Sequence, residues 1–149
     1  KFMDSSLVYL VQTDTTVGFS SSNDEKLSII KQRPKTKKIL NTVDSFCTLN
    51  KHTRVPKIFR KKIRNSKKIT FIYPNKMSFR VVKKSSNFFD FIHKFGILYS
   101  TSANKTAEKF DREFATLGAD ILVEDKKGFY ETTASTIIKL SKQNLKKIR

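Results

Sequence analysis

Small hydroxyl and amide side chains follow an apolar run in the second half of the chain, and side chains of this kind can bind an anion. Residues 96–99 (GILY) give way directly to residues 100–104 (STSAN). Hydroxyls and backbone N–H groups in a loop of small residues can surround phosphate oxygens. Segment 100–104 is therefore a candidate anion site, and a polar turn that leads into a helix is the alternative.

Two more polar clusters stand at the ends of expected elements. Thr13-Asp14-Thr15 follows a strand-like run, and Lys31 and Arg33 stand in the last turn of an expected helix, followed by Lys35, Lys37 and Lys38. Ligands of open α/β sheets bind outside the strand ends, so clusters there can share one crevice. Arg also offers a fork that matches paired oxygens. The alternatives are an ordinary Thr-Asp-Thr turn and basic side chains that complement the helix dipole.

The composition favours an anionic partner and disfavours several kinds of catalytic site. Lys and Arg number 31 against 13 Asp and Glu, a net charge of +18, which favours nucleic acid or a nucleotide as partner. A general preference for surface lysine is the alternative. The single Cys47 excludes an internal disulfide and a cysteine-rich metal site, and His52 and His93 stand at no metal-ligand spacing. No Ser-His-Asp order, P-loop or HExxH motif is present, so we expect no metal bound by protein side chains.

The length and the apolar content predict one packed domain over residues 1–149. A chain of 149 residues with 38% hydrophobic residues, 13 of them Phe, can bury a real core. No apolar run approaches the ~20 residues of a membrane-spanning helix, and no signal-peptide pattern is visible. We therefore expect a cytoplasmic protein with no membrane partner.

Apolar periodicity places strands and helices around the polar clusters. Strands are expected at 7–11, 37–43, 68–74, 78–82, 119–125 and 134–140, and residues 97–104 are expected to be a strand that leads into a polar loop. Helices are expected at 22–33, 45–49, 55–66, 87–96 and 107–118, and the basic tail 141–149 is expected to be helical or frayed. The irregular alternation predicts a mixed α/β fold with parallel and antiparallel strands in one twisted sheet.

Four residues predict turns and helix ends. Ser22 and Glu25 predict a capping box at the start of the first helix, because Glu stands three residues after Ser. Gly18 permits a tight backbone between the first strand and that helix. Gly96 is expected to cap the end of helix 87–96.

Five short motifs together resemble the YrdC-like family, whose best-understood members are threonylcarbamoyl-AMP synthases. In chain order they are QTDTTVGF (12–19), KQRPKTK (31–37), FRV (79–81), STSAN (100–104) and STII (135–138). Each is weak alone, but TDT, KxRP and STSAN in this order are specific, and the motifs cover nearly the whole chain. The resemblance implies a short single-domain member, with a twisted open mixed sheet flanked by helices and a positively charged concave face.

The resemblance also implies an activity and partners. The family's enzymes, which are nucleotidyltransferases, join L-threonine, bicarbonate and ATP into threonylcarbamoyl-AMP and pyrophosphate, with Mg²⁺ accompanying ATP. The product feeds the N6-threonylcarbamoyl modification of adenosine 37 in tRNA. The implied partners are therefore tRNA or double-stranded RNA and other proteins of that modification pathway.

The motif match implies roles for particular residues. Lys31 and Arg33 would hold the ATP phosphates and act in catalysis. The nucleotide site would also include Ser100, Ser102, Asn104 and Ser135. Threonine binding would fall to Thr13, Thr15 and Arg80. Candidates for RNA or phosphate contact are Lys37, Lys67 and Lys68.

The chain departs from the usual family pattern at a few positions, which leaves two other functions open. Gln12 and Ala134 replace prolines, Val17 replaces a substrate-pocket tyrosine, and residues 66–68 (SKK) replace Pro-Gly-Pro. One alternative is a YrdC-like domain that binds double-stranded RNA or tRNA without catalysis. The other is carbamoyl transfer in hydrogenase maturation, where such domains belong to larger chains with zinc motifs.

Overall fold

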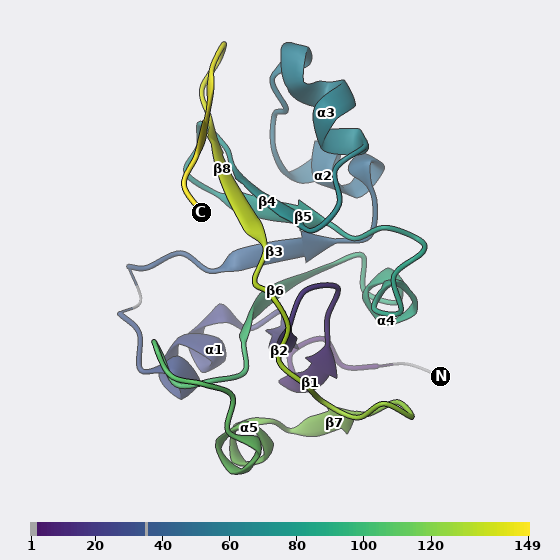
Figure 1. The fold of residues 1–149 in the computed structure, drawn as a ribbon, viewed down its shortest axis with the longest axis vertical. Coiled ribbons are helices and arrows are strands. Elements are labelled where there is room, and N and C mark those ends of the chain that lie inside the picture. Colours follow the sequence, from purple (N-terminus) through teal and green to yellow (C-terminus); the bar gives the residue numbers. More distant parts are fainter. Residues whose placement is uncertain (1–2, 35) are drawn as a thin grey trace.

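The computed structural model describes residues 3–34 and 36–149, so Lys35 of the second polar cluster lies outside the described residues. The described chain forms a nine-stranded mixed sheet in the order β7-β1-β2-β6-β3-β5-β4-β8-β9 (Figure 1). The strands are β1 Tyr9–Gln12, β2 Val17–Ser21, β3 Leu40–Val43, β4 Ile69–Ile72, β5 Ser78–Val81, β6 Ile97–Ser102, β7 Ile121–Val123, β8 Thr136–Leu140 and β9 Leu145–Lys147. The pairs β1–β7, β3–β5 and β4–β8 are parallel and the other pairs are antiparallel, which confirms the predicted mixed sheet.

Short helices cover parts of this sheet. They are α1 Asp24–Lys31, α2 Phe46–His52, the 3₁₀ turn η1 Lys57–Phe59, α3 Arg60–Arg64, α4 Phe89–His93 and α5 Arg112–Gly118. In Figure 1, α2 and α3 lie beside β4 and β5, whereas α1 and α5 lie at the other end of the sheet. No described helix combines the length and the apolar character needed to cross a lipid bilayer.

Alternation along β4 and β5 separates a core face from a polar face. Phe71 and Phe79 pack into the apolar cluster that also contains Leu49 of α2 and Ile63 of α3. Successive side chains of a strand point to opposite faces. The neighbouring polar side chains therefore face away from α2 and α3, and they line the cavity described below: Thr70, Ser78 and Arg80.

Strand β2 was missed by the sequence analysis, which placed only a tight backbone at Gly18. All five residues of β2 are buried between β1 and β6. A Cβ at Gly18 would lie 2.9 Å from the carbonyl oxygen of Thr101 on β6, so glycine here allows close strand approach rather than a turn. The sequence VGFSS lacks the alternation of a half-buried strand, because both of its faces are covered.

The helix boundaries differ from the predictions in ways that the local hydrogen bonds explain. The predicted Ser22–Glu25 capping box is wrong: Asn23 is the cap of α1, and its side chain accepts a hydrogen bond from Lys26 N. Helix α5 begins only after Asp111, whose carboxylate caps it, rather than at residue 107. Gly96 closes the α4 segment as predicted, with φ +83° and an N–H bond to Ile92 O of 2.8 Å.

The basic tail is neither helical nor frayed, which corrects another prediction. Residues 145–147 form β9, which pairs antiparallel with β8. Arg149 continues this pairing through backbone bonds to Ile137. The strand therefore returns the end of the described chain to the polar face of the sheet.

Candidate functional site

The three polar clusters predicted from the sequence meet at one cavity on the polar face of the sheet. The cavity has a volume of about 260 Å³. The predicted site residues that line it are Thr13, Thr15, Arg33, Arg80, Ser100, Ser102 and Ser135. The first two come from the β1–β2 turn, Arg33 follows α1, and the others lie on or beside β5, β6 and β8. Thr13 and Ser135, which are 122 residues apart in the sequence, thus contribute to one site.

Arg33 enters this cavity as a cation without a full set of partners. Gln32 takes a left-handed conformation with φ 53°, and the Arg33 N–H bonds Ser28 O at 2.9 Å, so the chain reverses as α1 ends. The Arg33 Nε atom is buried and has no hydrogen-bond partner in the described part of the chain. Burial lowers the pKa of its guanidinium below the ordinary value. A buried donor of this kind favours an acceptor supplied by a ligand.

Lys31 lies beside the cavity and holds the STSAN segment in place. Its side-chain amine donates to Ser102 O at 2.8 Å and also bonds the backbone oxygen of Asn104. The Ser102 hydroxyl and the Asn104 side-chain oxygen complete the surroundings at 3.4 and 3.2 Å. Lys31 is only 3% exposed. Burial, aided by the positive charges of Arg33 and Lys37, lowers the pKa of Lys31 to about 8.

Arg80 and Asp14 form a buried ion pair that the sequence analysis did not predict. The guanidinium donates from Nε to both carboxylate oxygens at 3.1 Å and from Nη2 to Oδ1 at 2.9 Å. Both side chains are at most 5% exposed. The pair joins β5 to the β1–β2 turn, where Thr13 Oγ1 donates to Thr16 O at 2.5 Å and lies 3.3 Å from Thr15 Oγ1. Asp14 thus fixes the Thr-Asp-Thr turn over the sheet.

The opposite rim of the cavity contains a third arginine, Arg149, which the sequence analysis missed. Ser135 shares a 2.7 Å hydroxyl hydrogen bond with Thr70, and its carbonyl oxygen accepts from Arg149 Nε and Nη2 at 3.0 and 2.8 Å. Arg149 therefore reaches the cavity rim through the pairing of β8 with β9. No local motif marks this arginine, because only the strand pairing brings it there.

The remaining predicted site residues lie outside this cavity. Lys67 and Lys68 line a different cavity of about 330 Å³, which shares Thr13 with the first. Asn104 lines a smaller cavity of about 170 Å³, together with Val17, Ala103 and Phe110. Lys37 is exposed on the segment after α1 and lines none of these three cavities.

The electrostatic character of the 260 Å³ cavity follows from its lining. Its basic residues are Arg33, Lys38, Arg80 and Arg149, and none of the described lining residues is Asp or Glu. Asp14 pairs with Arg80 but does not line this cavity. Arg33, Lys38 and Arg149 therefore meet no carboxylate in the described lining. Hydroxyls and cations of this kind suit an anionic ligand with several oxygens, such as a phosphate chain.

Among the known proteins compared with this chain, only solved structures match it. No protein-family model matches the sequence, and no curated protein matches it. A double variant of P. abyssi Sua5 superposes with a TM-score of 0.77 at 14% identity, over 97% of this chain and 49% of that one. E. coli YciO superposes with a TM-score of 0.76 at 17% identity, over 97% of this chain and 82% of that one. The chain thus spans about half the length of Sua5.

Two similar structures contain ligands. P. abyssi Sua5 complexed with L-threonine superposes with a TM-score of 0.76 at 14% identity, over 97% of this chain and 50% of that one. Full-length HypF in its phosphate- and nucleotide-bound form superposes with a TM-score of 0.72 at 13% identity, over 97% of this chain and 27% of that one. These similarities confirm the fold that the YrdC-like resemblance implied.

Proposed function

We propose that this chain, which has the fold of Sua5 and YciO, is an L-threonylcarbamoyladenylate synthase. One observation carries the proposal: the buried and unpartnered Nε of Arg33 lies at a cavity of Ser and Thr hydroxyls whose described lining lacks carboxylates. This environment suits the phosphates of ATP. The complex of P. abyssi Sua5 with L-threonine and the nucleotide-bound HypF support the choice of substrates.

The proposed reaction is an adenylyl transfer that the protein promotes by positioning and charge neutralisation. The deprotonated amine of threonine adds to the carbon of bicarbonate and water leaves, which gives the threonine carbamate. An oxygen of this carbamate attacks the α-phosphorus of ATP, the bond to the β-phosphate oxygen breaks, and pyrophosphate leaves. Arg33 would neutralise charge that develops on the phosphates, while the hydroxyls of Ser100, Ser102 and Ser135 would orient them. Thr13 and Thr15 would contact the substrate threonine. Arg80 would hold their turn in place through its ion pair with Asp14.

In this proposal Lys31 positions the site rather than neutralising phosphate directly. Its amine is surrounded by oxygens of Ser102 and Asn104, so it holds the segment that carries the proposed nucleotide-binding hydroxyls. The reaction would use Mg²⁺ bound to the ATP phosphates. The lining supplies hydroxyl oxygens but no carboxylate among the described residues, which fits a metal that arrives with the nucleotide.

The proposal is tested by a product assay. Purified protein with ATP, L-threonine, bicarbonate and Mg²⁺ should form threonylcarbamoyl-AMP and pyrophosphate in equal amounts, and omission of threonine should stop both. The Arg33→Ala variant should lose most of this activity. A matched variant, Arg112→Ala, changes an exposed arginine outside the cavity and should keep it. No product beside an active synthase control would overturn the proposal.

RNA binding without catalysis is a second candidate, favoured by the net charge of +18 and by Val17 in the 170 Å³ cavity. It predicts no product in the assay above together with salt-sensitive binding of duplex RNA or tRNA. If the chain is the synthase, the same positive charge would bind a tRNA partner. The synthase would then work in the cytoplasm with other proteins of the tRNA modification pathway.

A further inference from the structure

The 330 Å³ cavity beside the candidate site is lined by charges of both signs, which come from different parts of the sheet. Lys67 and Lys68 precede β4 and Lys83 follows β5, and we call these three residues the lysine wall. Glu124 and Asp125 follow β7, and we call them the carboxylate wall. Strands β1, β2, β6 and β3 separate β7 from β5 and β4. The two walls therefore reach the cavity from opposite halves of the sheet.

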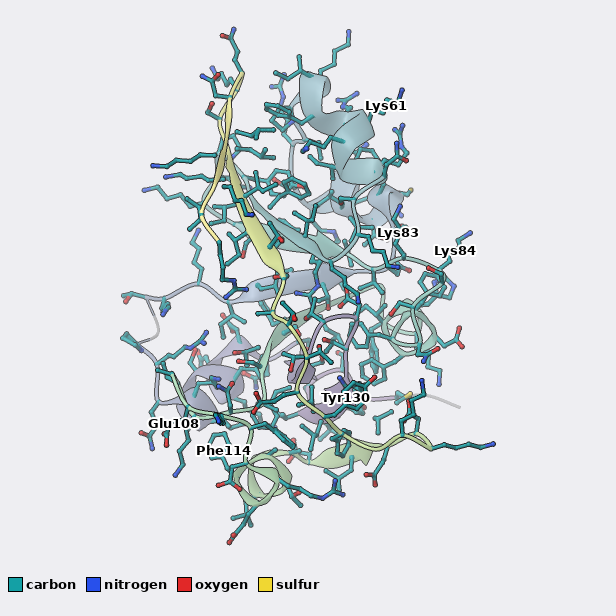
Figure 2. All side chains as sticks on the ribbon, in the orientation of Figure 1. Lys61, Lys83, Lys84, Glu108, Phe114 and Tyr130 are labelled. Atoms are coloured by element: carbon teal, nitrogen blue, oxygen red, sulfur yellow. The ribbon has the colours of Figure 1, made fainter. Side chains whose placement is uncertain are left out.

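An apolar floor lies between the two walls. Val11 of β1 and Phe91 of α4 are buried members of one apolar cluster, and Val123 of β7 packs against it. All three side chains line the cavity. In Figure 2, Lys83 lies above Tyr130, which lines the cavity on the segment that follows the carboxylate wall. A cleft of this size with an apolar interior and a few charged groups is typical of a small-molecule site.

Hydrogen bonds to the backbone hold a side chain of each wall. Lys83 Nζ donates to the carbonyl oxygen of Arg64 at 3.0 Å. On the other side, Asp125 Oδ1 accepts from Lys127 N at 2.9 Å. The amine and the carboxylate each keep further hydrogen-bonding capacity, since an amine has three donors and a carboxylate has two acceptor oxygens.

The opposite charges do not neutralise one another across the cavity. The lysine wall takes part in no ion pair in the described part of the chain, and the same holds for Asp125. Glu124 pairs with the exposed Arg112 at 3.2 Å, so it also has no lysine of the wall as partner. A ligand can therefore neutralise both walls only if it carries both charges and holds them apart.

This arrangement distinguishes between classes of ligand. A polyanion would meet the carboxylate wall and a polycation would meet the lysine wall, and both contacts are repulsive. A free α-amino acid carries its ammonium and its carboxylate on the same carbon. A dipeptide or an ω-amino acid carries them several bonds apart, so that its ammonium can reach one wall, its carboxylate the other, and its apolar part the floor.

The cavity adjoins the candidate site but is distinct from it. Thr13 lines both cavities. Asp14 lines the 330 Å³ cavity, whereas its partner Arg80 lines the 260 Å³ cavity, so the buried ion pair stands between the two. Arg33 lines the 260 Å³ cavity and not the other. A ligand of the 330 Å³ cavity would thus leave Arg33 uncontacted.

We propose that the 330 Å³ cavity binds a small zwitterion whose ammonium and carboxylate are several bonds apart, the class of dipeptides and ω-amino acids. Glu124 and Asp125 bind the ammonium, and the lysine wall binds the carboxylate. This binding goes beyond the proposed synthase reaction and requires neither ATP nor catalysis.

The test compares one dipeptide with two capped forms in calorimetric titrations of the full chain at neutral pH without ATP. Gly-Phe carries both charges, N-acetyl-Gly-Phe lacks the ammonium, and Gly-Phe amide lacks the carboxylate. Gly-Phe should bind at least about fivefold more tightly than either capped form, because each capped form loses a partly solvated charge contact. Free phenylalanine should also bind more weakly than Gly-Phe, since its charges cannot reach both walls.

Two double variants assign each charge of the dipeptide to its wall. Glu124→Gln with Asp125→Asn should largely lose the preference for Gly-Phe over the N-acetyl form and keep the preference over the amide. Lys67→Gln with Lys68→Gln should show the reverse pattern. A general structural effect would weaken all three ligands alike, so the crossed pattern separates the two explanations. The control Arg33→Ala should keep all affinities of the unmodified chain.

Three results would overturn the proposal. The first is no saturable binding of Gly-Phe up to about 10 mM. The second is equal affinity for Gly-Phe and its capped forms. The third is a loss in Arg33→Ala as large as in the wall variants, because the dipeptide would then occupy the candidate site. If a wall variant does not fold, the capped forms test the proposal on the unmodified chain. A failed synthase assay does not affect these titrations, since they contain no ATP.

Discussion

Two arginines at the same cavity differ in how their charge is balanced, and the difference assigns them different tasks. Arg80 is 3% exposed and forms a bidentate ion pair with Asp14. Arg33 presents a buried Nε that has no partner in the described chain. A buried cation is stable only when an anion balances it. Arg80 has that anion within the fold, so it organises the site, whereas the half-buried Arg33 keeps its Nε donor free for a ligand.

The elements that carry the two arginines explain this contrast. Arg80 lies in the middle of β5, which is paired on both sides with β3 and β4, and the β1–β2 turn brings Asp14 over it. Arg33 follows the left-handed Gln32 at the end of α1, where the chain reverses toward the cavity. A strand interior fixes an ion pair, while a helix end can present a cation to a ligand.

Breaking the internal pair should have the largest effect. The Asp14→Ala variant leaves Arg80 buried without its carboxylate, so the free energy of unfolding should fall by about 3–5 kcal/mol. Urea denaturation followed by circular dichroism measures this loss. The control Asp24→Ala removes an exposed carboxylate from the first turn of α1 and should lower it by less than about 1 kcal/mol. Equal losses in the two variants would show that the ion pair does not stabilise the fold.

Removing the unpartnered cation should have the opposite pattern, with loss of ligand binding and no loss of stability. The Arg33→Ala variant should bind Mg²⁺·ATP at least ~10-fold more weakly, since a charge-assisted hydrogen bond contributes about 1.5–3 kcal/mol. Its free energy of unfolding should stay unchanged or rise, because a buried unpaired donor is lost. Isothermal titration calorimetry and urea denaturation measure the two quantities. Unchanged affinity would refute the role of Arg33.

The pH dependence of ATP binding should reveal the charge on Lys31. Its pKa is lowered to about 8, so the amine is charged below that pH and loses its proton as the pH rises through it. The charged amine donates to oxygens of Ser102 and Asn104 and so holds the segment whose hydroxyls we expect to bind the phosphates. ATP affinity should therefore fall about three- to tenfold between about pH 7.5 and 9.5. The Lys31→Met variant should bind more weakly with a flatter pH profile, and parallel profiles would exclude Lys31 as the titrating group.

The smallest effect is expected at Arg149, which is exposed at the cavity rim. Solvent screens exposed charges, so the Arg149→Ala variant should weaken ATP binding only about two- to fivefold. The same calorimetric titration measures this change, with Lys147→Ala, at the end of β9 and two residues before Arg149, as the control. A loss as large as that of Arg33→Ala would mean that the two arginines contribute equally to the site.

Much of the fold follows from the local sequence, and the misses have physical reasons. The predictions found β1, β3, β6 and β8 because apolar runs form buried strands wherever they stand. They missed β2 because all five of its residues are buried, so the segment shows no alternation of apolar and polar side chains. They missed β9 because its exposed lysines resemble a frayed tail, although its backbone pairs with β8.

The sequence by itself determined the types of residue at the site, namely the hydroxyls of segment 100–104, the Thr-Asp-Thr turn and the cations after α1. Local order sufficed for these because strand ends and helix ends carry recognisable signals. Only the tertiary structure decided which charges are balanced. Asp14 and Arg80 are 66 residues apart, and Arg149 meets Ser135 only through strand pairing. Long-range pairing depends on the whole sheet, so it separated the arginine that organises the cavity from the arginine left for a ligand.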